Sequence, residues 1–169
     1  MNIRSFLCLA VTLLAAGVAT AKEKIVRIPA PDGVLPVVIT EMTVGNSGNA
    51  YSDYDRLAYA LERVAKERKW PVKISTDRFA SNAPDYLTEL RISLQRIRQE
   101  IPGEYLYRAW TSLLIDGKEH DFKIVSYSYR YRMGENMEDI LDKSFLGGAK
   151  ATAEKIEPLL FPELKKEKK

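Results

Sequence analysis

Apolar and polar residues alternate along the middle of the chain. Thr88, Leu90, Ile92 and Leu94 alternate with Glu89, Arg91, Ser93 and Gln95. A period of two is typical of a strand with one buried and one wet face. The same period returns at residues 125–132, where Val and Tyr alternate with Ser and Arg. Turn signals at Pro102-Gly103 and Asp116-Gly117 separate these segments from a strand predicted at residues 105–115. We therefore predict an antiparallel meander that ends with a strand at residues 122–133.

Two segments show helical spacing instead. The first follows Ser52, a candidate N-cap, and ends at Trp70-Pro71, with an apolar stripe formed by Leu57, Leu61, Val64 and Ala65. The second is predicted over residues 137–160, with Asn136 as its cap and apolar residues at helical spacing. Gly147-Gly148 lies inside it, at a cost of about 1 kcal/mol per residue relative to Ala. We expect this helix to approach a sheet closely, or to bend, at that point.

The N-terminal part predicts further strands. Residues 34–44 are rich in Val, Ile and Thr, and Pro36 directs the start of this strand toward a sheet edge. Shorter strands are expected at residues 24–28 and 72–75, and a loop at residues 45–49. The predicted fold class is α+β: a single small antiparallel or mixed sheet of four to six strands, with two helices packed on one face. We expect one domain over residues 22–162 and a basic disordered tail over residues 163–169.

The first 21 residues have the features of a signal peptide. Arg4 precedes an apolar run at residues 6–16, and Ala19-Thr20-Ala21 is an A-x-A cleavage signal. The run is too short for a confident membrane span. We therefore expect a periplasmic or secreted protein with no transmembrane segment after cleavage; retention of the leader as an anchor is the alternative. The only cysteine, Cys8, would leave with the leader, so residues 22–169 offer no disulfide, thiol nucleophile or thiolate metal site.

The net charge of the chain, +3, is mild and argues against nucleic acid as a partner of the whole molecule. Arginines nevertheless gather in the middle of the chain. If the tyrosines of the last strand pack under the helices, the open sheet face would carry a basic set formed by Arg91, Arg108, Arg130 and Arg132. Such a set is expected to bind phosphate groups of an envelope lipid or glycan. The alternative is a solvated face with aromatic packing between strands.

Residues 86–114, YLTELRISLQRIRQEIPGEYLYRAWTSLL, resemble a group of envelope proteins. The shared pattern is an alternating strand, a Gly-containing turn and a strand with Ala109-Trp110 near its centre; the Ala-rich helix at residues 147–160 also fits. The group comprises the lipopolysaccharide-assembly lipoprotein, the auxiliary lipoproteins of ABC-type lipid transporters and the N-terminal domain of the Tol-system translocation protein. The resemblance covers about residues 34–160 and implies two helices on one side of a small sheet, with no catalytic residues. Lys22 stands where those lipoproteins carry the lipid-modified cysteine.

Candidate catalytic residues are few. His120, the only histidine, is predicted in a hairpin loop, where Asp121 would orient it as a general base or where it would simply be exposed. Carboxylates that could form an acid–base pair lie near the predicted helix starts, where capping also explains them: Asp53, Asp55, Glu135, Glu138, Asp139 and Asp142. No metal-binding or cofactor motif is present, and residues 45–49 lack the ending of a phosphate loop.

Three functions follow from these observations. The leading expectation is a non-enzymatic envelope protein that binds a partner protein, or an anionic lipid or glycan, through its open sheet face or a sheet edge. The alternative is a small exported hydrolase that uses carboxylates and His120. The third is a structural subunit whose sheet is completed by another chain, which a long unpaired edge at residues 37–44 would favour.

Overall fold

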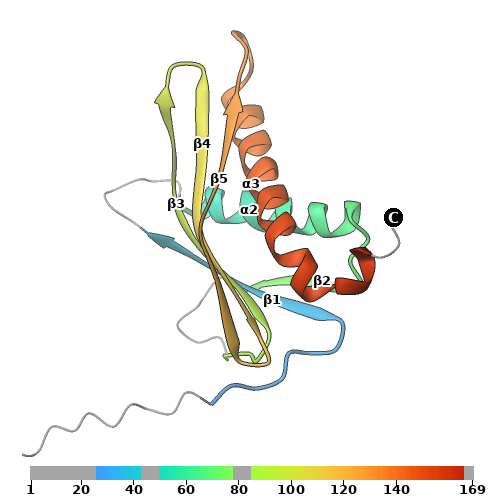
Figure 1. Ribbon diagram of the computed structural model, residues 1–169. Coiled ribbons are helices and arrows are strands. Elements are labelled where there is room, and N and C mark those ends of the chain that lie inside the picture. Colours follow the sequence, from blue (N-terminus) through green and yellow to red (C-terminus); the bar gives the residue numbers. More distant parts are fainter. Residues whose placement is uncertain (1–25, 43–49, 78–84, 166–169) are drawn as a thin grey trace, which may run out of the picture.

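The computed structural model describes residues 26–42, 50–77 and 85–165 (Figure 1). This part of the chain contains five strands, which are β1 (Val34–Met42), β2 (Lys73–Asp77), β3 (Glu89–Ile101), β4 (Glu104–Ile115) and β5 (Lys118–Arg130). It also contains α2 (Ala50–Glu67), α3 (Met137–Leu160) and a 3-10 helix (Pro162–Lys165). The predicted leader and the loop at residues 45–49 lie outside the described residues.

The strands form one mixed sheet in the order β2-β1-β3-β4-β5. β1 pairs in parallel with β2 and with β3, whereas β3, β4 and β5 form the predicted antiparallel meander. The α+β fold with a mixed sheet is therefore confirmed. Of the strand expected at residues 24–28, residues 26–28 are described, and they contain one bridge, between Ile28 and Tyr86.

β1 is an inner strand of the sheet, and it is paired with β3 from Val37 to Met42. A long unpaired edge at residues 37–44 would have favoured a subunit completed by another chain, but in the described part of this segment, residues 37–42, the side of β1 that faces β3 is paired. The prediction that Pro36 lies toward a sheet edge agrees better with the structure. Pro36 lies where β1 pairs with β2 alone, because the pairing with β3 begins one residue later. A residue without an N–H group is tolerated where one side of the strand is open.

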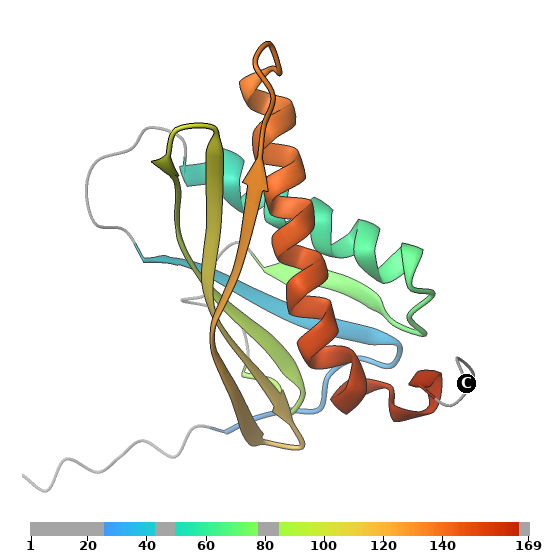
Figure 2. The same ribbon diagram turned by 45° about the horizontal axis from the view of Figure 1, so that its top comes forward.

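Both helices lie on one face of the sheet, with α2 beside α3 (Figure 2). The core between the two layers takes alternate residues from the inner strands, among them Val37, Ile92 and Ala109. The helices contribute the apolar stripe predicted for α2, together with Phe145, Ala149 and Ile156 of α3. Burial of such side chains stabilises the fold by about 1.5–3 kcal/mol for each large aliphatic or aromatic group.

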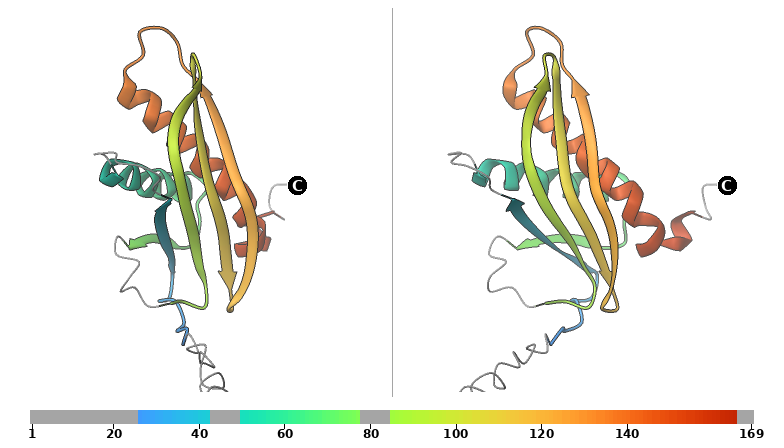
Figure 3. Two further views of the ribbon diagram at one scale, coloured as in Figure 1. Left: turned by 90° about the vertical axis from the view of Figure 1, so that its left-hand side faces the viewer. Right: turned by 60° about the vertical axis from the view of Figure 1, so that its left-hand side comes forward.

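The glycine pair of α3 lies where the helix meets the sheet. A Cβ atom on Gly148 would lie 2.4 Å from the ring of Tyr107, and one on Gly147 would lie 2.0 Å from the ring of Tyr127. The close approach expected from the sequence is therefore confirmed. The two tyrosines lie on the helix side of the sheet, so the residues that alternate with them face the open side (Figure 3).

The ends of the helices differ slightly from the prediction. α2 begins at Ala50, so Ser52 lies within the helix instead of capping it. α3 spans the predicted residues, and the Asn136 side chain accepts a hydrogen bond from the Glu138 N–H at 3.1 Å. The first residues of the predicted tail belong to the 3-10 helix, and residues 166–169 lie outside the described residues. In the described part of the chain, no helix is both long and apolar enough to cross a membrane.

Candidate functional site

The open face of the sheet, opposite the helices, holds three of the four predicted arginines. Strand register places Arg91 beside Ser112, and Arg108 beside Gln95 and Ser126. Arg130 lies beside Glu104. Successive arginines are thus four positions apart along β4, or about 14 Å at about 3.4 Å per residue. Arg132 follows the end of β5 by two residues and is outside the sheet. The arginines form a line along the face and not a single cluster.

Arg91 is held by carboxylates of its own chain. Its Nε atom donates to Glu89, and its terminal nitrogen lies 3.1 Å from the Asp85 carboxylate. Glu89 is only 1% exposed and also accepts the Tyr86 N–H at 3.1 Å. This ion-paired group holds residues 85–88 against the open face of the sheet. The alternation contained a signal for it, since Glu89 and Arg91 are two residues apart on one strand and therefore share a face.

The charge of the open face is mixed. Arg91 is matched by Glu89 and Asp85, and Arg130 lies directly opposite Glu104. Asp121, on β5, adds another exposed carboxylate on this side. Because opposite charges alternate along the strands, the face lacks the single-sign field that draws in a polyanion. Arg91, Arg108 and Arg130 therefore share the open face with carboxylates of the same chain.

An exposed apolar pair lies at the centre of the open face. Trp110 on β4 and Ile124 on β5 are direct partners in the register, with 41% and 45% of their surface exposed. Arg108 is two positions from Trp110, and Ser126 is two positions from Ile124. Directly opposite side chains on one sheet face are in contact range, with Cβ atoms about 4.5–5.5 Å apart. Trp110 and Ile124 thus form one apolar patch surrounded by polar residues.

Sequence reasoning missed this apolar pair. Trp110 is in phase with Arg108 and Ser112, so a large apolar residue stands among polar ones, and this signal was available. Its partner was not predictable from alternation alone. β5 contains a bulge at which Lys123 has a positive φ of 57°, and the register with β4 shifts between Trp110 and Ser112. The bulge decides that Ile124, and not a neighbouring residue, lies opposite Trp110.

His120 is placed differently from the prediction. The turn is limited to Asp116 and Gly117, both with positive φ, and His120 lies within β5 opposite Leu113. It is half-buried and not exposed in a loop. Asp121 is its neighbour on the strand and faces the other side of the sheet, where its carboxylate accepts the Lys123 N–H at 2.7 Å. Asp121 therefore does not orient the imidazole of His120 here.

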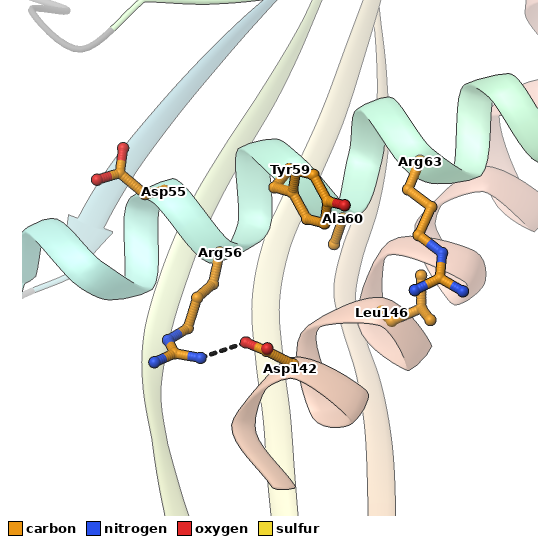
Figure 4. Close-up of a pocket in the computed structure, with 7 residues that line it drawn as sticks. All are labelled: Asp55, Arg56, Tyr59, Ala60, Arg63, Asp142 and Leu146. Atoms are coloured by element: carbon orange, nitrogen blue, oxygen red, sulfur yellow. Dashed lines mark hydrogen bonds and ion pairs between the residues drawn. The ribbon is translucent and has the colours of Figure 1, made fainter. Parts of the chain in front are cut away.

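A groove between α2 and α3 brings two candidate carboxylates to one surface (Figure 4). It has a volume of about 280 Å³ and is lined by Asp55, Arg56, Tyr59, Ala60, Arg63, Asp142 and Leu146. Asp142 is ion-paired with Arg56, which also donates to the Glu138 carbonyl at 3.4 Å. The Asp55 side chain points away from this pair. The two carboxylates do not converge on a common point, as an acid–base pair would require.

Of the four remaining acids of the predicted set, Asp53 lies in the first turn of α2, and the other three lie at the start of α3. Glu138 and Asp139 lie in its first turn, and the Glu135 carboxylate accepts the Tyr129 hydroxyl at 3.1 Å and the Lys143 ammonium at 3.3 Å. Partial burial opposes the charged form of Glu135, but these two donors together lower its pKa below the usual value. Among the described residues, no group of three or more His, Cys, Asp or Glu side chains could hold a metal ion.

No family model matches this chain, and no curated protein sequence matches it. Several solved structures share its fold. An uncharacterized protein aligns with 79% of this chain and 96% of its own length, at 10% identity and a TM-score of 0.51. A PelC dodecamer from Paraburkholderia phytofirmans covers 75% of this chain and 90% of its own, at 12% identity and a TM-score of 0.45.

Rare lipoprotein B from Shewanella oneidensis also belongs to this group of structures. The alignment covers 75% of this chain and 97% of that protein, at 13% identity and a TM-score of 0.38. At identities of 10–13%, the likeness concerns the fold alone.

Proposed function

We propose that this chain is an exported, non-enzymatic binding protein that docks a partner protein of the cell envelope on the open face of its sheet. The observation that carries the proposal is the exposed pair Trp110 and Ile124. Tryptophan and arginine are enriched at the energetic centres of protein interfaces, usually where a small apolar group is surrounded by polar residues. The patch, with Arg108 and Ser126 at its border, has that composition.

The mixed charge of the face favours a protein over an anionic lipid or glycan. Arg91 and Arg130 each have a carboxylate of the same chain beside them, so they would reach a phosphate only in competition with that group. A protein surface offers both signs of charge and an apolar group for the central pair. The signal-peptide features of residues 1–21 support an encounter outside the cytoplasm.

The proposal assigns no catalytic step to the chain. It rests on the separation of the candidate groups, since His120 and Asp121 face opposite sides of β5 and Asp55 points away from Asp142. A hydrolase that used these carboxylates and His120 would need them around one reacting atom.

The test is retention of envelope proteins by the full chain purified with an affinity tag. We compare the wild type with a double variant, Trp110→Ser with Ile124→Ser, and identify the retained proteins by mass spectrometry. We expect a specific partner whose yield falls tenfold or more in the double variant. Ile101→Ser is the matched control, because Ile101 is exposed at the tip of the β3–β4 hairpin, away from the patch.

Two results would contradict the proposal. One is a partner retained equally by the wild type and the double variant when both have the same circular dichroism spectrum. The other is binding to vesicles that contain anionic phospholipid, lost when Arg108 and Arg130 become Ser but kept in the double variant. That second result would assign the face to an anionic envelope component instead.

A further inference from the structure

The two edges of the sheet differ in length and in protection. β2 is a five-residue strand with Lys73 and Asp77 at its ends, and short, charged edge strands discourage pairing with other chains. β5 has thirteen residues, and its segment 124–129 reads Ile-Val-Ser-Tyr-Ser-Tyr, without charge or proline. Segments of this kind, when exposed at an edge, readily pair with another strand. Among the described strands, β5 pairs with β4 alone.

The direction of the outer backbone groups follows from one hydrogen bond. The Tyr131 N–H donates to the Gly103 carbonyl at 3.0 Å, so the odd-numbered residues at this end of β5 face β4. The N–H and C=O groups of adjacent residues point to opposite edges of a strand. Ile124, Ser126, Ser128 and Arg130 therefore direct their backbone groups outward, and all four side chains are exposed.

We propose that two copies of this chain associate through their β5 strands, antiparallel and centred on Ser126. Both copies use the same edge in such a contact, so the contact is isologous and the assembly is complete with two copies. The two sheets would join into one that continues across the contact. α3 crosses behind β5, on the helix side of the sheet and not on its open face (Figure 3).

The charges along β5 complement one another in this register. At the bulge around Lys123, two residues of β5 lie opposite one residue of β4. When residues are counted along β5 to find their partners in the other copy, residues 122 and 123 therefore take one position. With Ser126 opposite its own copy, Ile124 faces Ser128. Arg130 then faces Asp121, and Arg132, two positions further, lies toward Glu119. All four charged side chains are exposed, and the symmetry repeats each pair.

Arg130 and Asp121 also have neighbours within their own chain. Arg130 stands beside Glu104 on β4, and Asp121 accepts the Lys123 N–H through one carboxylate oxygen. The second oxygen of Asp121 is the acceptor that the Arg130 guanidinium of the other copy would meet. The result would be a row in which Arg130 lies between two carboxylates, one from each chain.

The test is the molar mass of the full chain by sedimentation velocity over a range of concentrations. We expect the wild type to dimerise, and both Arg130→Asp and Asp121→Arg to raise the dissociation constant tenfold or more. Each single variant sets like charges opposite one another. In the heterodimer that forms in an equimolar mixture of the two variants, both rows again set opposite charges against each other, so the mixture is expected to dimerise more tightly than either variant alone. Lys155→Glu, an exposed charge reversal on α3, is the control and should dimerise as the wild type does.

A wild type that stays monomeric at about 1 mM, the weak end of protein affinities, would overturn the inference. So would a dimer whose dissociation constant is the same in Arg130→Asp as in the wild type. The circular dichroism spectrum shows whether each variant is folded. If Asp121→Arg disturbs the bulge at Lys123, Arg130→Asp still tests the inference, because that change leaves the bulge intact.

Ile124 and Ser126 lie at both the dimer contact and the partner patch, but Trp110 belongs to the patch alone and the ion pairs belong to the dimer alone, so the two proposals fail separately. Trp110→Ser with Ile124→Ser should reduce partner retention without abolishing the dimer, since these changes leave both ion pairs in place. Arg130→Asp should weaken the dimer tenfold or more whether or not a partner is retained. A dimer that is lost in the Trp110 and Ile124 variant but kept in Arg130→Asp would show that the copies meet through the open face and not through the edge.

Discussion

Gly148 has a structural role in α3, although glycine has a low helix propensity. Its α-carbon lies against the ring of Tyr107, which is fully buried between α3 and β4. Burial also raises the pKa of the Tyr107 hydroxyl. The helix can approach the sheet this closely only because residue 148 has no side chain.

Substitution of Gly148 by Ala should therefore destabilise the fold. Ala would gain about 1 kcal/mol in helix propensity, but its Cβ would lie 2.4 Å from the Tyr107 ring, and overpacking of a core costs about 1–3 kcal/mol. We expect a net loss of about 1 kcal/mol in the free energy of unfolding, measured by urea denaturation. Lys155→Ala, on the exposed side of the same helix, should change it by less than about 0.5 kcal/mol. A Gly148→Ala variant more stable than the wild type would show that the contact relaxes freely.

Single residues also show how far the sequence could lead. The cap at Asn136 and the close approach at Gly147-Gly148 were predictable, because each depends on neighbours along the chain or on helix geometry alone. The ion pair of Arg91 with Glu89 was accessible in the same way, since the two residues share a strand face. The pairing of Trp110 with Ile124 was not, because a bulge at Lys123 sets that register.

At the scale of elements, one cluster joins the end of β5 to the start of α3. Tyr129 and Lys143 both contact Glu135, and the Lys143 ammonium lies 5.5 Å from the centre of the Tyr129 ring. These contacts lower the pKa of Glu135, despite its partial burial, and raise that of Lys143 through the Tyr129 hydroxyl and the Glu135 carboxylate. The contacts between β5 and α3 therefore depend on pH in both the acidic and the alkaline range.

Glu135→Gln should destabilise the protein only where Glu135 is ionised. Its folded-state pKa is below the unfolded value of about 4.3, so its contribution is present above that pH and is lost as the pH falls through the folded-state pKa. Lys143, with a raised pKa, keeps its contribution until the pH rises above about 10.4. We expect the melting temperatures of variant and wild type to differ between about pH 5 and 9 and to converge below about pH 4.

The matched control for this pH effect is Glu163→Gln, which changes an exposed carboxylate of the 3-10 helix. Its melting temperature should follow that of the wild type at every pH. A Glu135→Gln difference that persisted unchanged at pH 3 would show that the variant disturbs packing rather than the charged contacts.

The arrangement of elements was only partly accessible from the sequence. Strand and helix positions were predicted well, because alternation and helical spacing are local patterns. The place of β1 between β2 and β3 was not, since parallel pairing joins segments that α2 and the later strands separate along the chain. The buried neighbours Leu113 and Leu114 also break the alternation, because residues 85–88 cross the β4–β5 hairpin, where the Gly117 N–H donates to the Leu87 carbonyl at 2.7 Å.

At the scale of the whole molecule, the chain carries a reporter in each of two distant regions. Its two tryptophans are Trp70 and Trp110. Trp70 is buried where α2 and α3 end, with its ring 5.4 Å from that of Phe161 and its Nε1 donating to Glu157 at 3.3 Å. Trp110 is half-exposed on the opposite side of the sheet. Between them lies one continuous core cluster, which takes residues from both helices and from the inner strands.

One core predicts one cooperative transition. We expect the fluorescence of Trp70 in Trp110→Phe, and of Trp110 in Trp70→Phe, to change at the same urea concentration as the far-ultraviolet circular dichroism of the same variant. Trp70→Phe loses the bond to Glu157, so its midpoint should be lower than that of Trp110→Phe, but its two signals should still coincide. All samples are measured at one protein concentration, because self-association would shift the midpoints. If the Trp110 signal changed at a lower urea concentration than the dichroism, the β4–β5 hairpin would open before the core. The Trp110 patch and the β5 edge, which both lie on this hairpin, would then belong to a separately unfolding unit.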